Sequence, residues 1–123
     1  MLSSLTRYAR SFFTSAPISQ EQAQAAKDTV ESLIGSPIAV FSKSYCPYCT
    51  EAKSILGSHG VASRMKVIEL DREALGGPIQ QYLAEKAGAT KVTIYIKGQN
   101  IGGCSDLKKL QQQGKLKDML AQA

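Results

Sequence analysis

Residues 38–49 read Ile-Ala-Val-Phe-Ser-Lys-Ser-Tyr-Cys-Pro-Tyr-Cys, and this stretch predicts the centre of the fold. Its first four residues form a short apolar run, which is typical of a buried strand. Pro47 suits the first position of a helix, because the N–H that proline lacks would have no partner there. The stretch therefore predicts a strand that leads through a short turn into a helix, with Cys46 and Cys49 at the helix start.

Helices and strands alternate on both sides of this stretch. Ser19 and Gln22 have the spacing of a capping box and predict a helix that ends at Gly35 and Pro37. The other predicted elements are strands at 67–70, at 92–96 and around Ile101, and helices at 76–88 and after Ser105, which is expected to cap its helix. The order α-β-α-β-α-β-β-α predicts an α/β sandwich with a small mixed sheet, parallel where helices cross over and antiparallel at the final hairpin.

The chain has 123 residues, which is room for about one domain. With 43% hydrophobic and 20% charged residues, the composition is typical of a globular core and argues against disorder. No apolar run approaches the ~20 residues that a membrane-spanning helix needs, so no membrane contact is expected. The net charge is +5, but the lysines are scattered, and we expect no nucleic-acid partner. Three cysteines, two of them close together, favour a redox or metal site over a disulfide framework.

The first twenty residues have a composition of their own. They contain no Asp or Glu, carry Arg7, Arg10 and five serines, and place apolar residues at helical spacing. This pattern is typical of an organelle transit peptide, whereas a secretory signal would need a continuous apolar stretch. An arginine ten positions before the expected cut resembles a mitochondrial processing site, so we expect residues 1–19 to be a cleaved transit peptide and 20–123 the domain. The net charge then falls to +3. The alternative is a frayed arm, which would leave the protein in the cytoplasm.

The two close cysteines suggest thiol chemistry. Cys46 is expected at the helix N-cap, where the positive end of the helix dipole and the nearby Lys43 lower the thiol pKa and favour the nucleophilic thiolate. Cys49, further into the helix, can reach that sulfur and resolve a mixed disulfide. A zinc site is the competing interpretation, but the remaining candidate ligands, Cys104 and His59, do not form a second close pair. A pair of small buried residues without chemistry is the other alternative.

Two motifs in this order resemble the glutaredoxin family, specifically its dithiol class with a Cys-Pro-Tyr-Cys site. They are residues 42–49, Ser-Lys-Ser-Tyr-Cys-Pro-Tyr-Cys, and residues 101–107, Ile-Gly-Gly-Cys-Ser-Asp-Leu. The resemblance covers about residues 20–123. It implies the thioredoxin fold, a small four-stranded mixed β-sheet flanked by helices. It also implies glutathione as cosubstrate, no metal, and reduction of protein–glutathione mixed disulfides and protein disulfides. The expected partners are glutathione and such client proteins, and the expected state is a monomer in the mitochondrial matrix.

The resemblance also assigns roles to single residues. Cys46 is implied to be the nucleophile that takes up glutathione, and Cys49 the resolving thiol. The implied glutathione-binding residues are Lys43, Tyr48, Gln80, Val92, Gly103, Cys104, Ser105 and Asp106. Lys43 would face the glycine carboxylate, Tyr48 would pack beside the tripeptide, and Gln80 would hydrogen-bond it.

The Cys104-Ser105-Asp106 turn would hold the γ-glutamyl end, Cys104 through its backbone. A helix start offers N–H groups to a carboxylate, and Asp106 can accept from the ammonium. Helix capping is the simpler role for Ser105 and Asp106, and both roles can coexist. The Cys104 thiol is open to three interpretations: a buried filler, a site of secondary oxidation or glutathionylation, or a link between chains. His59 is expected to be structural.

One family signature, Thr-Val-Pro with a cis proline, has no counterpart before the third predicted strand. Residues 88–96 read Gly-Ala-Thr-Lys-Val-Thr-Ile-Tyr-Ile, and the four prolines lie at 17, 37, 47 and 78. Residues 90–92 could replace the signature directly, but we prefer an alignment in which the proline after Val92 is absent. By resemblance, the Val92 backbone then holds the cysteine part of glutathione. A non-proline cis bond costs ~2.5–4 kcal/mol, so a trans loop is expected. Such a loop would misplace these groups and impair the glutathione chemistry.

Two other functions compete with the oxidoreductase. A glutaredoxin-like dimer could hold an iron–sulfur cluster through Cys46 and glutathione thiols; by family resemblance Pro47 disfavours this, whereas the absent proline favours it. A client of a thioredoxin-type reductase is the second alternative. The glutathione-binding turn and the lack of any tryptophan argue against it.

Overall fold

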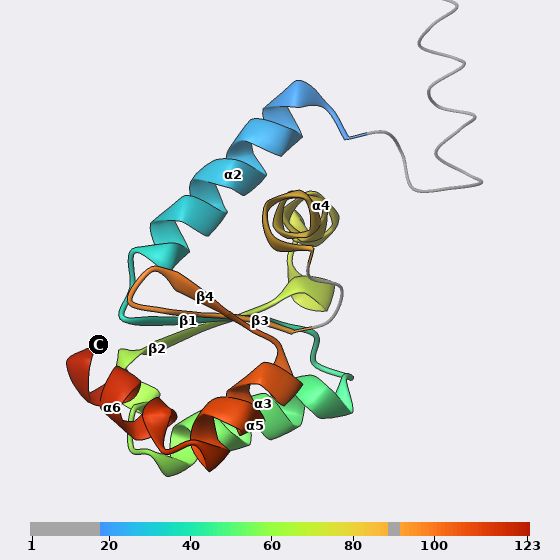
Figure 1. Ribbon diagram of the computed structural model, residues 1–123. Coiled ribbons are helices and arrows are strands. Elements are labelled where there is room, and N and C mark those ends of the chain that lie inside the picture. The colour runs from blue at the N-terminus through green and yellow to red at the C-terminus, as the bar shows by residue number, and fades with distance from the viewer. Residues whose placement is uncertain (1–17, 89–91) are drawn as a thin grey trace, which may run out of the picture.

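Strand β1 (Ile38–Ser42) lies inside a four-stranded sheet of order β2-β1-β3-β4 in the computed structural model, which describes residues 18–88 and 92–123. All five residues of β1 are buried, which confirms the buried strand predicted from its apolar run. Helices cover both faces of the sheet (Figure 1). The predicted α/β sandwich with a small mixed sheet is therefore confirmed.

The sheet is parallel on one side of β1 and antiparallel on the other. Helix α3 (Pro47–Ser58) and a 3₁₀ turn at Ala62–Arg64 connect β1 to β2 (Met65–Glu69), which runs parallel to it. A second 3₁₀ turn at Leu70–Arg72 and helix α4 (Gly76–Ala87) lead to β3 (Thr93–Ile96), which pairs with β1 antiparallel. A two-residue turn then leads to the antiparallel β4 (Gln99–Gly102).

The prediction of parallel pairing wherever a helix crosses over is wrong for β3. Thr93 pairs with Phe41 near the end of β1 where Ser42 pairs with Glu69 of β2. The connection through α4 thus begins and ends at the same end of the sheet, so β3 must run back along β1. Leu70, predicted as part of the strand, lies instead in the 3₁₀ turn that starts this connection.

Alternate residues of the central strands face two separate cores. Ile38 and Val40 belong to the core beneath α3, α5 (Cys104–Gln112) and α6 (Lys115–Gln122). Ala39 and Phe41 belong to the core beneath α2 (Gln20–Ile34) and α4. Figure 1 shows these two helical layers on opposite faces of the sheet. A period of two along a doubly buried strand is what such a three-layer arrangement requires.

The helix ends follow most of the sequence signals. Ser19 and Gln22 form the predicted capping box, with both hydrogen bonds at 3.1 Å, and Gly88 ends α4 in the left-handed conformation. The predicted last helical region is two helices, because Gly114 interrupts it with φ of 73°. The N-cap of α5 is Gly103, so the prediction that Ser105 caps this helix is wrong.

No helix in the described parts of the chain is long and apolar enough to cross a membrane. Residues 1–17 of the predicted transit peptide lie outside the described residues, as do residues 89–91 of the loop before β3.

Candidate functional site

Cys46 is the N-cap of α3, where the sequence places it. Its backbone is extended, with φ of −88° and ψ of 121°, and Pro47 follows as the first helical residue. The residue is partly exposed at the end of the turn that leaves β1. The Cys46 side chain accepts no capping hydrogen bond from the first turn of α3. The lowered pKa of Cys46 stays a prediction.

Cys49 is buried beneath Cys46 and behaves differently. Its side chain is fully enclosed, and the Lys43 backbone N–H donates to its sulfur at 3.4 Å. Burial raises the pKa of Cys49 to about 11; the Lys43 bond works against this rise, and hydrogen bonding with Cys46 adds to it. Cys49 is therefore a protonated thiol at neutral pH. The two cysteines are chemically unequal, with the outer one placed to react.

Asp71 fixes the turn that carries Cys46. Its carboxylate accepts the Ser44 N–H at 2.8 Å and also a short hydrogen bond from the Ser44 hydroxyl. These bonds hold the pKa of Asp71 below its usual value. The sequence analysis did not identify Asp71. A signal existed, since Asp71 follows a strand parallel to β1 and the carboxyl ends of parallel strands meet at one edge of a sheet.

A second set of contacts secures the end of β1 against α3. The buried Ser42 hydroxyl donates to one carboxylate oxygen of Glu69 at 2.6 Å, and the Lys53 ammonium contacts the other at 2.6 Å. Burial works to raise the pKa of Glu69, but the bonds from Lys53 and Ser42 outweigh it and lower the pKa below its usual value. The carboxylate thus stays charged and connects β1, β2 and α3.

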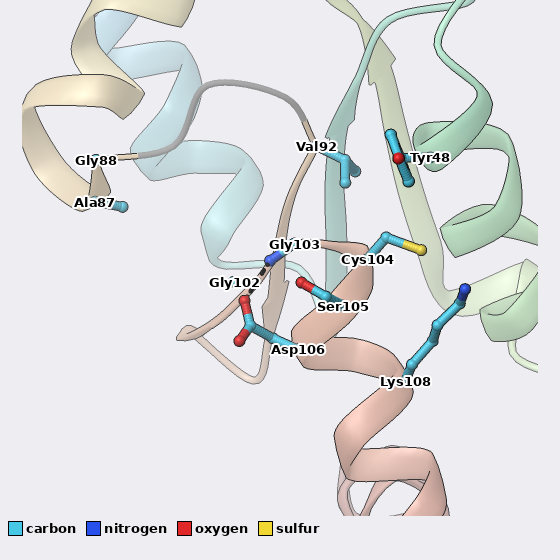
Figure 2. A pocket seen from close by; sticks show the side chains of 10 residues that line it. All are labelled: Tyr48, Ala87, Gly88, Val92, Gly102, Gly103, Cys104, Ser105, Asp106 and Lys108. Atoms are coloured by element: carbon cyan, nitrogen blue, oxygen red, sulfur yellow. Dashed lines mark hydrogen bonds between the residues drawn. The ribbon is translucent and has the colours of Figure 1, made fainter.

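A pocket of about 510 Å³ opens beside the first turn of α3. It lies between that turn, the end of α4, Val92 just before β3, and the first turn of α5 (Figure 2). Six predicted glutathione-binding residues line it: Tyr48, Val92, Gly103, Cys104, Ser105 and Asp106. Two others, Lys43 and Gln80, and the thiols of Cys46 and Cys49 are not among the lining residues. The structure thus places the turn predicted to hold the γ-glutamyl group, Tyr48 and Val92 around one pocket.

The α5 side of the pocket is a narrow turn that depends on glycine. Gly102 has φ of 104°, and a Cβ there would lie 2.2 Å from Asp106 Oδ2. That same oxygen accepts the Gly103 N–H at 3.1 Å (Figure 2). Asp106 therefore does act as a helix cap, the simpler of its two predicted roles. Its second oxygen is available for a ligand, and binding stays a prediction.

Four lining residues were not predicted: Ala87, Gly88, Gly102 and Lys108. Lys108 could have been found, because it lies four positions after Cys104 and so shares its face of α5. Its ammonium pairs with Glu51 of α3. The fold therefore adds a lysine, paired with a carboxylate outside the pocket lining, to one wall of the pocket.

Cys104 lies at the start of α5 and His59 at the end of α3. Cys104 is buried, and burial together with Glu51 raises the pKa of its thiol, which disfavours a reactive thiolate. His59 ends α3 as its C-cap. Within residues 18–88 and 92–123, no group of three or more His, Cys, Asp or Glu side chains is arranged to hold a metal ion.

Comparisons with family models, curated proteins and solved structures all match this chain to glutaredoxins. The family model described as Glutaredoxin matches residues 38–101. "Glutaredoxin-1" of Rhizophagus irregularis is 45% identical over 97 residues, which span 77% of this chain and 94% of the relative. "Glutaredoxin-C1" of Arabidopsis thaliana is 37% identical over 115 residues, 92% of this chain and 90% of the relative. The crystal structure of a buckwheat glutaredoxin–glutathione complex is similar, with a TM-score of 0.80 and 36% identity over 85% of this chain and 94% of that one. The predicted thioredoxin fold is thereby confirmed.

Replacing Asp71 with Asn is expected to destabilise the turn that carries Cys46, because an amide oxygen cannot accept both Ser44 bonds as the carboxylate does. The folded-state pKa of Asp71 is lowered, so the ionised carboxylate stabilises the folded protein. This contribution to the free energy of unfolding is complete above the ordinary pKa of 3.8 and is lost as the pH falls through the folded-state pKa. Thermal melts should show a lower midpoint for the variant at neutral pH and equal midpoints in stronger acid. Asp118→Asn, at an exposed position of α6, is the control. A deficit that persists unchanged into acid would contradict this role.

Proposed function

Because the chain belongs to the glutaredoxin family, we propose that it reduces protein–glutathione mixed disulfides, with Cys46 as the nucleophile and glutathione as the reductant. Members of this family are glutathione-dependent thiol oxidoreductases. The observation that carries the proposal is the inequality of the two thiols. Cys46 is partly exposed at a helix N-cap, whereas Cys49 is fully buried with a pKa of about 11. This arrangement supports Cys46 as the nucleophile and Cys49 as the resolving thiol.

The exchange proceeds through two displacements at sulfur. The Cys46 thiolate attacks the glutathione sulfur of the mixed disulfide, the client leaves as a thiolate, and a Cys46–glutathione disulfide forms. A second glutathione thiolate then attacks the bound glutathione sulfur, which releases glutathione disulfide and restores the Cys46 thiolate. With a disulfide-bonded client, Cys46 attacks a client sulfur, and Cys49 then loses its proton and displaces the client to give a Cys46–Cys49 disulfide. Each displacement forms one S–S bond and breaks one.

Glutathione fits the pocket beside Cys46 by size and chemistry. About 510 Å³ lies within the range of small-molecule sites. The first turn of α5 presents backbone N–H groups to a carboxylate, and the second Asp106 oxygen can accept from an ammonium. The γ-glutamyl end carries both groups. The roles of Lys43 with the glycine carboxylate and of Gln80 rest on the family resemblance, since neither lines the pocket.

The sequence before β3 bears on how well this site works. Val92 is buried and lines the pocket, and no proline follows it. Its carbonyl oxygen lies 3.4 Å from where a Cβ on Gly103 would be, so the two walls of the pocket approach each other closely here. We propose that the one-residue-shorter connection misplaces the Val92 backbone relative to glutathione and lowers turnover.

For the location of the protein we propose the mitochondrial matrix. The support is the acid-free, arginine- and serine-bearing stretch of residues 1–19, whose form is typical of a transit peptide.

Replacing each active-site thiol by serine separates their roles. Cys46→Ser is expected to abolish turnover of a glutathione mixed disulfide, because no nucleophile remains. Cys49→Ser should keep turnover within about a few-fold, since the second displacement uses glutathione and not Cys49. The measurement is glutathione-disulfide formation in a reductase-coupled assay, with circular dichroism to confirm folding. A Cys49→Ser variant as inactive as Cys46→Ser would show that the nucleophile is misassigned.

Insertion of Pro between Val92 and Thr93 should raise kcat/KM for the same substrate by about ten- to a hundredfold, the scale of effect that an ångström of repositioning produces. Insertion of Ala at the same place is the matched control for loop length. If the chain as written turns over as fast as the proline variant, the proposed impairment is refuted.

Fusion of residues 1–19 to a fluorescent reporter should direct it to mitochondria, where the fusion is shortened. Replacing Arg7 and Arg10 with Gln should leave the reporter in the cytoplasm, because import of such segments needs their positive charge. Equal distribution of the two fusions would rule out the transit-peptide assignment.

A further inference from the structure

Lys108 is the cation that the described wall of the pocket presents to a ligand. It lies one turn after Cys104, and a long helical side chain points back toward the helix N-terminus. Figure 2 shows its ammonium beside Cys104, with Tyr48 across from it. Among the described residues that line the pocket, the charged side chains are Asp106 and Lys108. The first turn of α5 is therefore flanked by one carboxylate and one ammonium.

The ammonium of Lys108 forms an ion pair with the carboxylate of Glu51 on α3. The two side chains are 46% and 42% exposed. An ion pair this exposed is weak, because water competes for both charges and two long side chains must be ordered. Lys108 can therefore exchange Glu51 for another carboxylate at little cost, without leaving the pocket wall.

The charges on this wall match the γ-glutamyl group of glutathione. That group carries an ammonium and an α-carboxylate on one carbon. Asp106, with one oxygen occupied by the Gly103 N–H, suits the ammonium. The α-carboxylate needs positive charge within reach of the same turn, and Lys108 supplies a full charge where the helix start supplies partial ones.

We propose that Lys108 is a specificity-determining residue that binds the α-carboxylate of the γ-glutamyl group, and that Glu51 competes with the ligand for it. The inference rests on the proposed function, since it takes glutathione as the occupant of the pocket. It makes Glu51 a modulator of affinity: the free protein keeps Lys108 neutralised, and the ligand displaces Glu51.

This competition has a signature that a purely structural bridge between α3 and α5 lacks. Removing either charge breaks the bridge, so a structural role predicts that Glu51→Gln and Lys108→Gln weaken binding alike. Competition predicts opposite effects, because Glu51→Gln frees Lys108 for the ligand whereas Lys108→Gln removes the ligand's partner.

The test is calorimetric binding of S-methylglutathione to the full chain carrying Cys46→Ser, in which no thiol exchange occurs and serine is a good N-cap residue. Lys108→Gln in this background should weaken binding by about three- to tenfold. Glu51→Gln should tighten it by about two- to threefold, and the double variant should match Lys108→Gln. Lys108→Arg should keep most of the affinity. Lys109→Gln, on the same helix but outside the pocket lining, is the control for net charge and should have little effect.

Two analogues of S-methylglutathione test which carboxylate of the ligand Lys108 contacts. With the γ-glutamyl α-carboxylate replaced by a carboxamide, Lys108→Gln should no longer weaken binding. With only the glycine carboxylate so replaced, the loss should persist. Equal weakening by Glu51→Gln and Lys108→Gln, no effect of Lys108→Gln, or a loss that survives the γ-glutamyl carboxamide would each overturn the inference while the proposed function stands. If the folded Cys46→Ser variant binds no S-methylglutathione, both the inference about Lys108 and the proposed function are overturned.

Discussion

The burial of β1 on both faces is the constraint on which the site depends. Because Ile38 and Val40 pack on one helical layer while Ala39 and Phe41 pack on the other, the strand can neither slip nor turn over without exposing a core. Its end is fixed too, by the Ser42 hydroxyl on the Glu69 carboxylate. A chain that leaves the sheet from so rigid a point enters α3 at a defined position.

That position makes two cysteines of one motif chemically different. Cys46 stays at the surface, at the positive end of α3, whereas the helix carries Cys49 inward against the sheet. A buried thiolate would be costly, so the Cys49 pKa rises. The turn between strand and helix is held from outside by Asp71, which accepts both the backbone and the hydroxyl hydrogen bond of Ser44. The difference between the two thiols therefore comes from their positions on α3, whereas the turn before α3 is fixed by Asp71 after β2.

The pocket is assembled from segments that are distant in the chain. Tyr48 comes from α3, Val92 immediately precedes β3, and Asp106 and Lys108 come from α5 (Figure 2). Gly102 lets β4 turn into α5 with a positive φ, and a Cβ at this position would collide with the Asp106 carboxylate. The walls thus combine the start of a helix, a narrow glycine turn and a lysine whose ion pair with Glu51 is partly exposed.

The sequence by itself determined most of the elements and the Cys46 position at a helix start, because apolar periodicity, capping residues and proline act within a few neighbouring positions. The residues expected around the pocket came instead from the resemblance of two motifs to a known family. The prediction that Ser105 caps α5 was wrong because Gly103, two positions earlier, occupies the N-cap. Only the tertiary structure decided the antiparallel pairing of β3, the burial that raises the Cys49 pKa, and the contact of Asp71 with Ser44, 27 positions away. These depend on how the layers pack, and no local pattern specifies which distant groups that packing brings together.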